Sequence, residues 1–189
     1  MAEKVHLTLD LLEKLIPYAT DKARIKFLVP LQTTLERYSI TSIARASAFL
    51  AQITHESGSL RYVEEIASGS AYDHRSDLGN TCSDAVIVSR ANGTTPGKFY
   101  KGHGLIQITG YYNHKAAGIA LGVNAINNPR ILCDPLYAAL SAGWFWDTHN
   151  CNALADVLLF DKITKVINGG YNGLAERTKY YERNLQILG

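Results

Sequence analysis

Apolar residues recur at helical spacing through the first third of the chain, so this part is expected to be helical. Thr8 is a plausible cap for the first helix and Thr41 for the last one, because both hydroxyl residues directly precede an apolar periodic run. The last helix has a broad apolar face and ends at Glu56. The expected elements are a helix over 9–16, two short helices in series over 21–38, and a helix over 42–56.

The helical pattern is lost over residues 66–104, where glycine, asparagine and proline interrupt a stretch with few core positions. We interpret this stretch as a long loop region, with possible short strands around 85–88 and 105–108. Long ordered loops in compact domains are often functional, so the region is expected to form the wall of a cleft and not a linker.

The C-terminal part returns to helical patterns. Asp134 followed by proline is a strong start signal for a nearly continuous apolar helix, and Asp161 is a candidate cap for a later, shorter one. The expected helices cover 135–148, 161–168 and 174–187. No internal repeat and no second domain is visible, so residues 1–189 are expected to form a single, mainly α-helical domain, with the 1–40 helices packed on a 41–189 core.

Composition narrows the range of functions. The chain has 189 residues, is 47% hydrophobic and has a net charge of +2, which fits one domain with a substantial core. Because its charges form no basic stripe, nucleic-acid binding has little support. Its cysteines, Cys82, Cys133 and Cys151, are widely spaced, which argues against a disulfide framework or a zinc site. The apolar stretch at the N-terminus is too short and too charged for a signal peptide or membrane span.

Two acidic positions are candidate catalytic residues. Glu56 lies at the end of the 42–56 helix, and Glu65 follows nine residues later, directly after Glu64. Two carboxylates on either side of a bound sugar are the minimum equipment for breaking a glycosidic bond. At a helix C-terminus after an apolar run, the dipole and a partly dry setting would favour a protonated acid. A solvated surface glutamate is the alternative interpretation of Glu56 alone.

The segment 100–110 is rich in glycine, which lets the backbone approach a ligand closely. Gln107 and Thr109 alternate there with apolar residues, so one face could pack while the other offers hydrogen bonds. On pattern alone, a buried strand ending in a turn explains the segment better.

Four motifs in order carry a family resemblance: His-Glu-Ser-Gly at 55–58, Gly-Leu-Ile-Gln-Ile-Thr-Gly at 104–110, Trp-Phe-Trp at 144–146 and Ile-Asn-Gly-Gly at 167–170. Over about residues 40–189 the chain resembles glycoside hydrolase family 19, and most closely its short phage and prophage endolysin members. The resemblance implies a lysozyme-like or chitinase-like helical fold with at most a small β element lining a glycan cleft.

The resemblance also implies roles. Glu56 matches the general acid, Glu65 the general base, with Glu64 as the alternative base, and Thr109 matches the residue that holds the attacking water. The family inverts the anomeric centre, for which the carboxyl groups stand roughly 6.5–9.5 Å apart. It implies neither a metal nor another cofactor. Further residues matched to the cleft or to the acid's surroundings are Gln107, Asn168 and Arg177.

One departure from the family pattern stands at Gly102-His103-Gly104, where relatives commonly carry Gly-Arg-Gly. A histidine titrates near pH 6.5 when unperturbed, so we expect lower or more pH-dependent activity, with His103 at the substrate site. Trp144 and Trp146 are expected in the core. The tyrosines near the motifs are candidate platforms for stacking on a sugar ring: Tyr62, Tyr72, Tyr100, Tyr111 and Tyr171.

The leading hypothesis from the sequence is an endolysin, a lysozyme-type enzyme that hydrolyses peptidoglycan as a monomer. It would accumulate in the cytoplasm of a bacterial host until a separate holin-type protein gives it access to the cell wall and periplasm. A chitinase is the alternative enzyme, because both polymers contain β-1,4-linked N-acetylglucosamine. A catalytically silent glycan-binding protein is the alternative from another class.

Overall fold

The computed structural model describes residues 4–189, which form helices joined by turns. Residues 1–3, which belong to the predicted 1–189 domain and to its N-terminal apolar segment, lie outside the described part. Within residues 4–189 there is no β-strand, only isolated bridges that pair His103 with Glu64 and with Ile108. The predicted mainly helical class, with at most a small β element, is confirmed.

The N-terminal helices are α1 (Leu9–Leu15) and α2 (Asp21–Arg37). The Thr8 cap is confirmed, since its hydroxyl accepts a hydrogen bond from the Leu11 amide at 3.2 Å. The prediction of two short helices over 21–38 is wrong, because α2 continues through Pro30. A buried stripe on α2 packs along α7, and this tertiary packing outweighs the hydrogen bond lost at proline.

Helix α3 (Ile43–Glu56) lies at the centre of the main core and is capped by Ser42 instead of the predicted Thr41. Its side chains from Ala46 to Thr54 are all buried, because α8, α9 and α10 pack against it. The strong burial on all sides fixes the direction in which α3 ends. Glu56, its last residue, therefore leaves the core at a defined place.

The stretch predicted as a long loop contains short helices: η1 (Ser70–Tyr72), η2 (Ser76–Leu78), α4 (Ser83–Ala91) and α5 (Pro96–Phe99). The predicted strand at 85–88 is wrong, because these residues lie inside α4, where one side packs on Tyr100. The predicted strand at 105–108 is a tight turn, in which Gln107 has a left-handed φ of 57°.

The remaining helices are α6 (Tyr111–Leu121), η3 (Pro129–Cys133), α7 (Pro135–Thr148), α8 (Cys151–Asp156), α9 (Phe160–Asn168) and α10 (Leu174–Leu188). The sequence pattern did not predict α6, because its buried stripe includes His114 and Gly118 while the apolar Tyr112 and Ile119 are exposed. Asp134 caps α7 as predicted, through its side chain and the Leu136 amide. Asp161 is not the cap of α9, which starts one residue earlier at Phe160.

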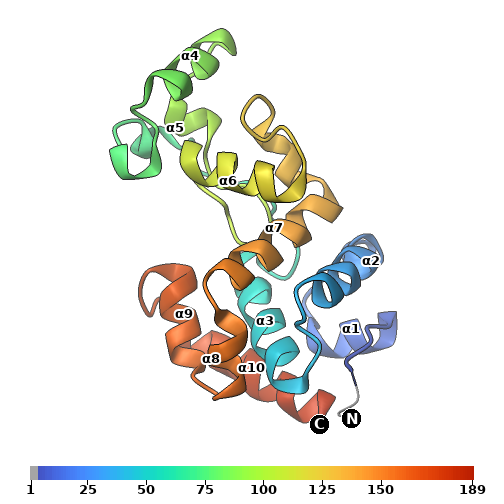
Figure 1. The fold of residues 1–189 in the computed structure, drawn as a ribbon. Helices are drawn as coiled ribbons and strands as arrows, with labels where there is room; N and C mark the ends of the chain where they lie inside the picture. Colours follow the sequence, from blue (N-terminus) through green and yellow to red (C-terminus); the bar gives the residue numbers. More distant parts are fainter. Residues whose placement is uncertain (1–3) are drawn as a thin grey trace.

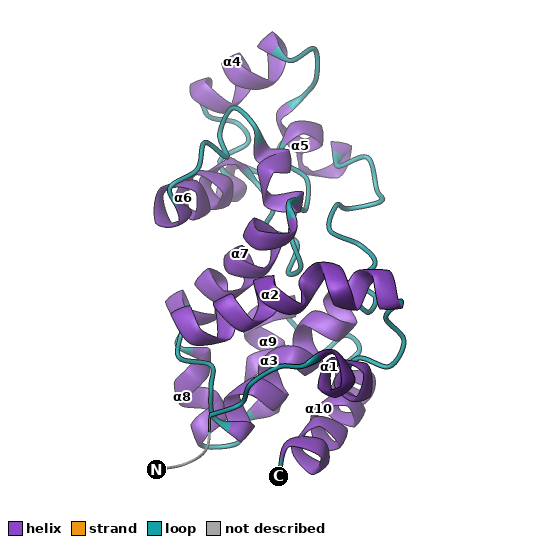
Figure 2. Ribbon diagram, turned by 90° about the vertical axis from the view of Figure 1, so that its right-hand side faces the viewer, coloured by secondary structure: helices purple, strands orange, loops and turns teal. Residues whose placement is uncertain are grey.

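The helices gather at two ends of the molecule (Figures 1 and 2). Helices α4, α5 and α6 lie at one end, and α1, α3, α8, α9 and α10 lie at the other, with α7 between them. A second, small core around Tyr100 and Tyr111 supports the α4–α6 end. Residues 57–69 connect the end of α3 to the α4–α6 end, so the carboxylates of this connection lie between the two groups of helices.

Candidate active site

Glu56 is held by a buried arginine. The Arg177 side chain is only 1% exposed, and its Nη2 donates to Glu56 Oε1 at 2.5 Å. The other guanidinium donors are also used, Nη1 by Gln52 Oε1 at 2.6 Å and Nε by the Asn172 carbonyl at 3.2 Å. A guanidinium fixed at three points cannot follow a moving partner, so Glu56 is held in one orientation.

The support behind this ion pair reaches a third helix. Gln52 lies one helical turn before Glu56 on the same face of α3, and its Nε2 donates to Thr164 Oγ1 of α9 at 2.8 Å. Gln52 and Thr164 are fully buried. Sequence reasoning missed Gln52, although its spacing of four from Glu56 could have indicated a shared face. The network makes α3, α9 and α10 one rigid frame for the carboxylate.

Glu65 has a different set of partners. Its Oε1 accepts from the Tyr72 hydroxyl at 3.0 Å and its Oε2 accepts from the Gly102 amide at 2.9 Å. Its own amide donates to the Gly102 carbonyl at 2.8 Å. Unlike Glu56, Glu65 has no ion-pair partner within residues 4–189. The half-buried Glu65 carboxylate is thus held in one orientation by two neutral hydrogen-bond donors.

Glu64, the alternative base, is tied up by cations. Its two carboxylate oxygens pair with Lys101 Nζ and Arg130 Nη2, each at 3.0 Å. Its backbone is bridged to His103. Both carboxylate oxygens of Glu64 are engaged by cations, whereas Glu65 is held only by the neutral donors Tyr72 and Gly102, which favours Glu65 over Glu64 as the base.

The acid and base candidates line one open pocket of about 290 Å³, here called the carboxylate pocket. Gln107 lies on its wall, where its side-chain amide donates to the Gly104 carbonyl at 2.9 Å. The lining residues are Glu56, Tyr62, Glu64, Glu65, Ile66, Ala67 and Gln107. The structure thus brings Glu56, Glu65 and Gln107 together, as the spacing and motifs predicted.

Two further predicted residues, Thr109 and Asn168, do not line this pocket. Thr109 is half-buried, and its hydroxyl donates to the Gln107 carbonyl at 2.9 Å, which leaves the oxygen free to accept. Asn168 ends α9, and its buried Oδ1 accepts no hydrogen bond from the described residues. Their parts in substrate binding stay predictions.

The predicted sugar platforms separate into two groups. Tyr100 and Tyr111 are 0% and 3% exposed, so neither ring has a free face, and we correct the expectation that they bind substrate. They pack on each other and on α4 in the small core. Tyr62 and Tyr171 are exposed, and Tyr72 serves Glu65 through its hydroxyl. The two tryptophans pack in the main core, as predicted.

His103 does not line the pocket, which corrects another expectation. It is 1% exposed, and its Nδ1 lies 3.0 Å from His114 Nε2. Burial, followed by the charge of Lys101, lowers the pKa of His103 to about 4. Its imidazole is therefore neutral near neutral pH, and the expected titration near pH 6.5 is wrong. His114 gave no sequence signal, because its partner lies eleven positions away.

Two carboxylates with different partners, facing one open pocket of a helical fold, form the kind of site that glycoside hydrolases use. Residues 39–158 match the family model described as chitinase class I. The chain belongs to this family, glycoside hydrolase family 19.

Relatives support the assignment at the level of sequence and fold. The chain is 39% identical to an endochitinase of Arabidopsis thaliana over 76% of its own length and 47% of the relative's. It is 30% identical to chitinase 10 of Oryza sativa subsp. japonica, over 83% of the chain and 66% of the relative. It thus spans about half the length of the Arabidopsis enzyme.

The structure resembles chitinase C from Streptomyces griseus with a TM-score of 0.76 and 26% identity, covering 96% of this chain and 92% of that one. The match to the family model and to these relatives confirms the resemblance to glycoside hydrolase family 19. These relatives are chitinases, so they favour the chitinase alternative over the endolysin hypothesis. The resemblance to phage members stays a prediction.

Proposed function

We propose that the protein hydrolyses the β-1,4 bonds of a chitin-type glycan by an inverting mechanism. The observation that carries this proposal is the shared carboxylate pocket, in which Glu56 and Glu65 have partners suited to different roles. Chitinases among the relatives support the substrate class. The scissile bond would lie between the two carboxyl groups.

In this mechanism Glu56 donates its proton to the glycosidic oxygen while the bond to the anomeric carbon breaks. Glu65 accepts a proton from the water that attacks the opposite face, so the product has the inverted configuration. Arg177 keeps Glu56 in place after the proton has left, because its guanidinium pairs with the new carboxylate. Thr109 is the proposed water holder, and Gln107 and Asn168 are the proposed sugar contacts.

A second candidate substrate is peptidoglycan, and one observation favours it. An open depression of about 690 Å³ lies beside the turn that follows Glu56, and we call it the basic depression. Its lining includes three cations, Arg61, Lys179 and Arg183, against one carboxylate, Glu176. Chitin is uncharged, whereas peptidoglycan carries carboxylates on its stem peptides, which such a surface would attract.

The endolysin role belongs to this second candidate, with cytoplasmic accumulation and a separate holin-type protein as parts of the proposal. Among residues 4–189, no helix combines the length and the apolar character needed to cross a bilayer.

The catalytic assignment is tested by replacing each carboxylate with its amide. Glu56→Gln and Glu65→Gln should each lower the hydrolysis of soluble chitin oligomers by about 10²–10⁴-fold, the usual contribution of a general acid or base. Glu64→Gln is the matched control from the same pocket and should retain most activity. Proton NMR of the first product should show the inverted anomer. If Glu65→Gln were fully active and Glu64→Gln inactive, Glu64 would be the general base in place of Glu65.

The substrate is tested by digesting chitin oligomers and purified peptidoglycan separately and identifying the fragments by mass spectrometry. Cleavage of chitin supports the first candidate, and cleavage of peptidoglycan alone supports the second. If the basic depression binds peptidoglycan, the double substitution Arg61→Gln with Lys179→Gln lowers its cleavage and leaves chitin cleavage unchanged. No release from either polymer, at any enzyme concentration, contradicts the hydrolase function for this chain.

A further inference from the structure

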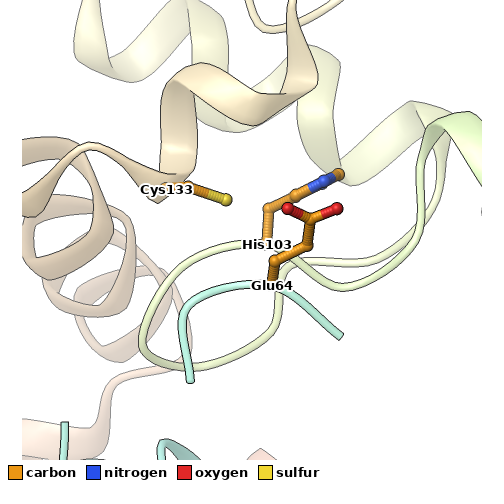
Figure 3. A group of neighbouring side chains, drawn as sticks. All are labelled: Glu64, His103 and Cys133. Carbon is orange, nitrogen blue, oxygen red and sulfur yellow. The ribbon is translucent and has the colours of Figure 1, made fainter. Parts of the chain in front are cut away.

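Three side chains with metal-binding atoms lie close together, and one of them, Glu64, also lines the carboxylate pocket (Figure 3). Glu64, His103 and Cys133 each bring one such atom, and these atoms all lie within 4.8 Å of one another. Glu64 and His103 are held side by side by their backbone bridge, and Cys133 ends η3. The ligands come from three separate segments, so their spacing in the sequence gave no metal signal.

The hydrogen bonds of the histidine pair decide which His103 atom is free. His114 Nδ1 lies 2.8 Å from the Gly110 carbonyl, which only accepts, so this nitrogen carries the proton. The Nε2 atom of His114 is then an acceptor, and His103 Nδ1 donates to it at 3.0 Å. His103 Nε2 is left with a bare lone pair. An imidazole whose other nitrogen is fixed in this way is the usual form of a histidine metal ligand.

The Cys133 thiol is half-buried, and its sulfur donates to the Val63 carbonyl at 3.1 Å. Burial, followed by the charge of Glu64, raises the pKa of this thiol. Lys101 and Arg130 act in the opposite direction, and they also keep the neighbouring imidazole neutral. Cys133 therefore stays a neutral thiol until a metal cation displaces its proton.

The charges around the cluster allow a dication. Arg130, one of the two cations on Glu64, has a side chain that is 73% exposed, so its ion pair is weak and easily exchanged. A thiolate and a carboxylate together neutralise a charge of two, and the imidazole adds none. The Lys101 pair with the other oxygen of Glu64 can remain in place.

From this geometry we propose that Glu64, His103 and Cys133 bind a divalent transition-metal cation of the zinc type. The ligands are a Glu64 carboxylate oxygen, His103 Nε2 and Cys133 Sγ, a mixed set that such ions accept, with solvent as the fourth ligand. On binding, the S–H bond of Cys133 breaks, a metal–sulfur bond forms, and the proton passes to the solvent. No electron transfer is involved, and the binding does not depend on the proposed glycosidase function.

The site lies close to the base candidate. Glu64 is adjacent to Glu65, and His103 follows Gly102, which hydrogen-bonds both the side chain and the backbone of Glu65. A bound ion would tether these two segments to η3. We therefore expect occupancy to change the glycan hydrolysis rate as a secondary effect.

The binding test uses the whole chain with Co²⁺ as a spectroscopic probe and Zn²⁺ in calorimetry. Wild type should give a thiolate-to-cobalt charge-transfer band and bind one Zn²⁺ per chain, with an affinity that increases with pH because a proton is released. Cys133→Ser should abolish the band and weaken Zn²⁺ binding by at least about tenfold. Cys82→Ser, a half-buried cysteine outside the cluster, is the matched control and should retain both signals.

Two further variants should change the Zn²⁺ affinity in opposite directions, which a general loss of folding would not produce. Glu64→Gln should weaken Zn²⁺ binding, whereas Arg130→Gln should strengthen it, because the competing cation is removed. Zn²⁺ should also slow alkylation of Cys133 in the wild-type protein, measured by peptide mass spectrometry. Binding that is unchanged in Cys133→Ser, or a wild-type protein with no cobalt–thiolate band at millimolar Co²⁺, would overturn the proposal.

Discussion

Acidification should destabilise the fold through the buried pair His103 and His114. Burial lowers the pKa of His103 to about 4 and that of His114 to about 3, so both rings are neutral in the folded protein. In the unfolded chain a histidine titrates near pH 6.5. Between that value and about 4, the unfolded chain binds more protons than the folded one. Stability is therefore fully present above about pH 6.5 and is lost as the pH falls towards 4.

The size of the effect follows from the same values. Each neutral histidine costs about 1.4 kcal/mol for every pH unit below its unfolded pKa. Lowering the pH from about 7 to about 5 should thus remove about 2 kcal/mol for each ring, and about 4 kcal/mol for the pair. A domain of this kind has about 5–15 kcal/mol in total, so the change is large enough to measure.

The assay is urea unfolding at both pH values, followed by circular dichroism. His103→Asn loses hydrogen bonds and should be less stable at every pH, so the informative quantity is the difference between the two pH values. That difference should shrink by about 2 kcal/mol in His103→Asn, and it should be unchanged in His6→Gln, which alters an exposed histidine. Equal differences in His103→Asn and wild type would refute the reasoning, because protonation of other groups would then explain the acid sensitivity.

Three further predictions test the frame of the site. Arg177→Met should lower the free energy of unfolding by about 1–3 kcal/mol in chemical denaturation, because it leaves the buried amide of Gln52 without its partner and the partly exposed carboxylate of Glu56 unpaired. Gly143→Ala should cost about 1–3 kcal/mol, since its methyl group would overlap side chains of α2, whereas Gly170→Ala, whose nearest new contact is at 3.9 Å, should be neutral. Tyr72→Phe should lower the hydrolysis rate about tenfold in steady-state kinetics, because Glu65 loses a donor.

The helices with a clear apolar stripe could be predicted from the sequence. Caps such as Thr8 and Asp134 are local signals, and the structure confirms both. The prediction at Pro30 was wrong because it used the local rule that proline interrupts a helix. The packing of the buried face of α2 against α7 keeps the helix continuous through the proline. The α4 and α6 helices were missed because the small core that supports them is built from distant aromatic residues.

The site shows the same division between local and distant signals. The motifs and the nine-residue spacing predicted Glu56 and Glu65 as site residues, and the structure places both on the wall of one pocket. Sequence alone left Glu64 and Glu65 as alternatives, because their difference lies in partners that come from elsewhere, the two cations on one and the Gly102 amide on the other. The buried state of Tyr100 likewise depends on α4 and α6, so no local pattern could reveal it.

The histidine at position 103 has a further consequence for charge. The family resemblance implies a Gly-Arg-Gly pattern with arginine at this place, yet here the neighbouring acid, Glu64, already has Lys101 and Arg130 as partners. A buried arginine at 103 would be a third cation for one carboxylate, and a buried charge without its own partner costs several kcal/mol. His103→Arg should therefore destabilise this protein although it restores the family residue.

The same charge argument predicts a rescue. Adding Arg130→Gln to His103→Arg frees one oxygen of Glu64 for the new guanidinium, so the double variant should recover part of the lost stability in thermal unfolding. A lone Arg130→Gln substitution, which removes an exposed ion pair, should change stability by less than about 1 kcal/mol and serves as the control. If His103→Arg were as stable as wild type, the charges of Lys101 and Arg130 would not disfavour a cation at position 103, and the charge argument would be wrong.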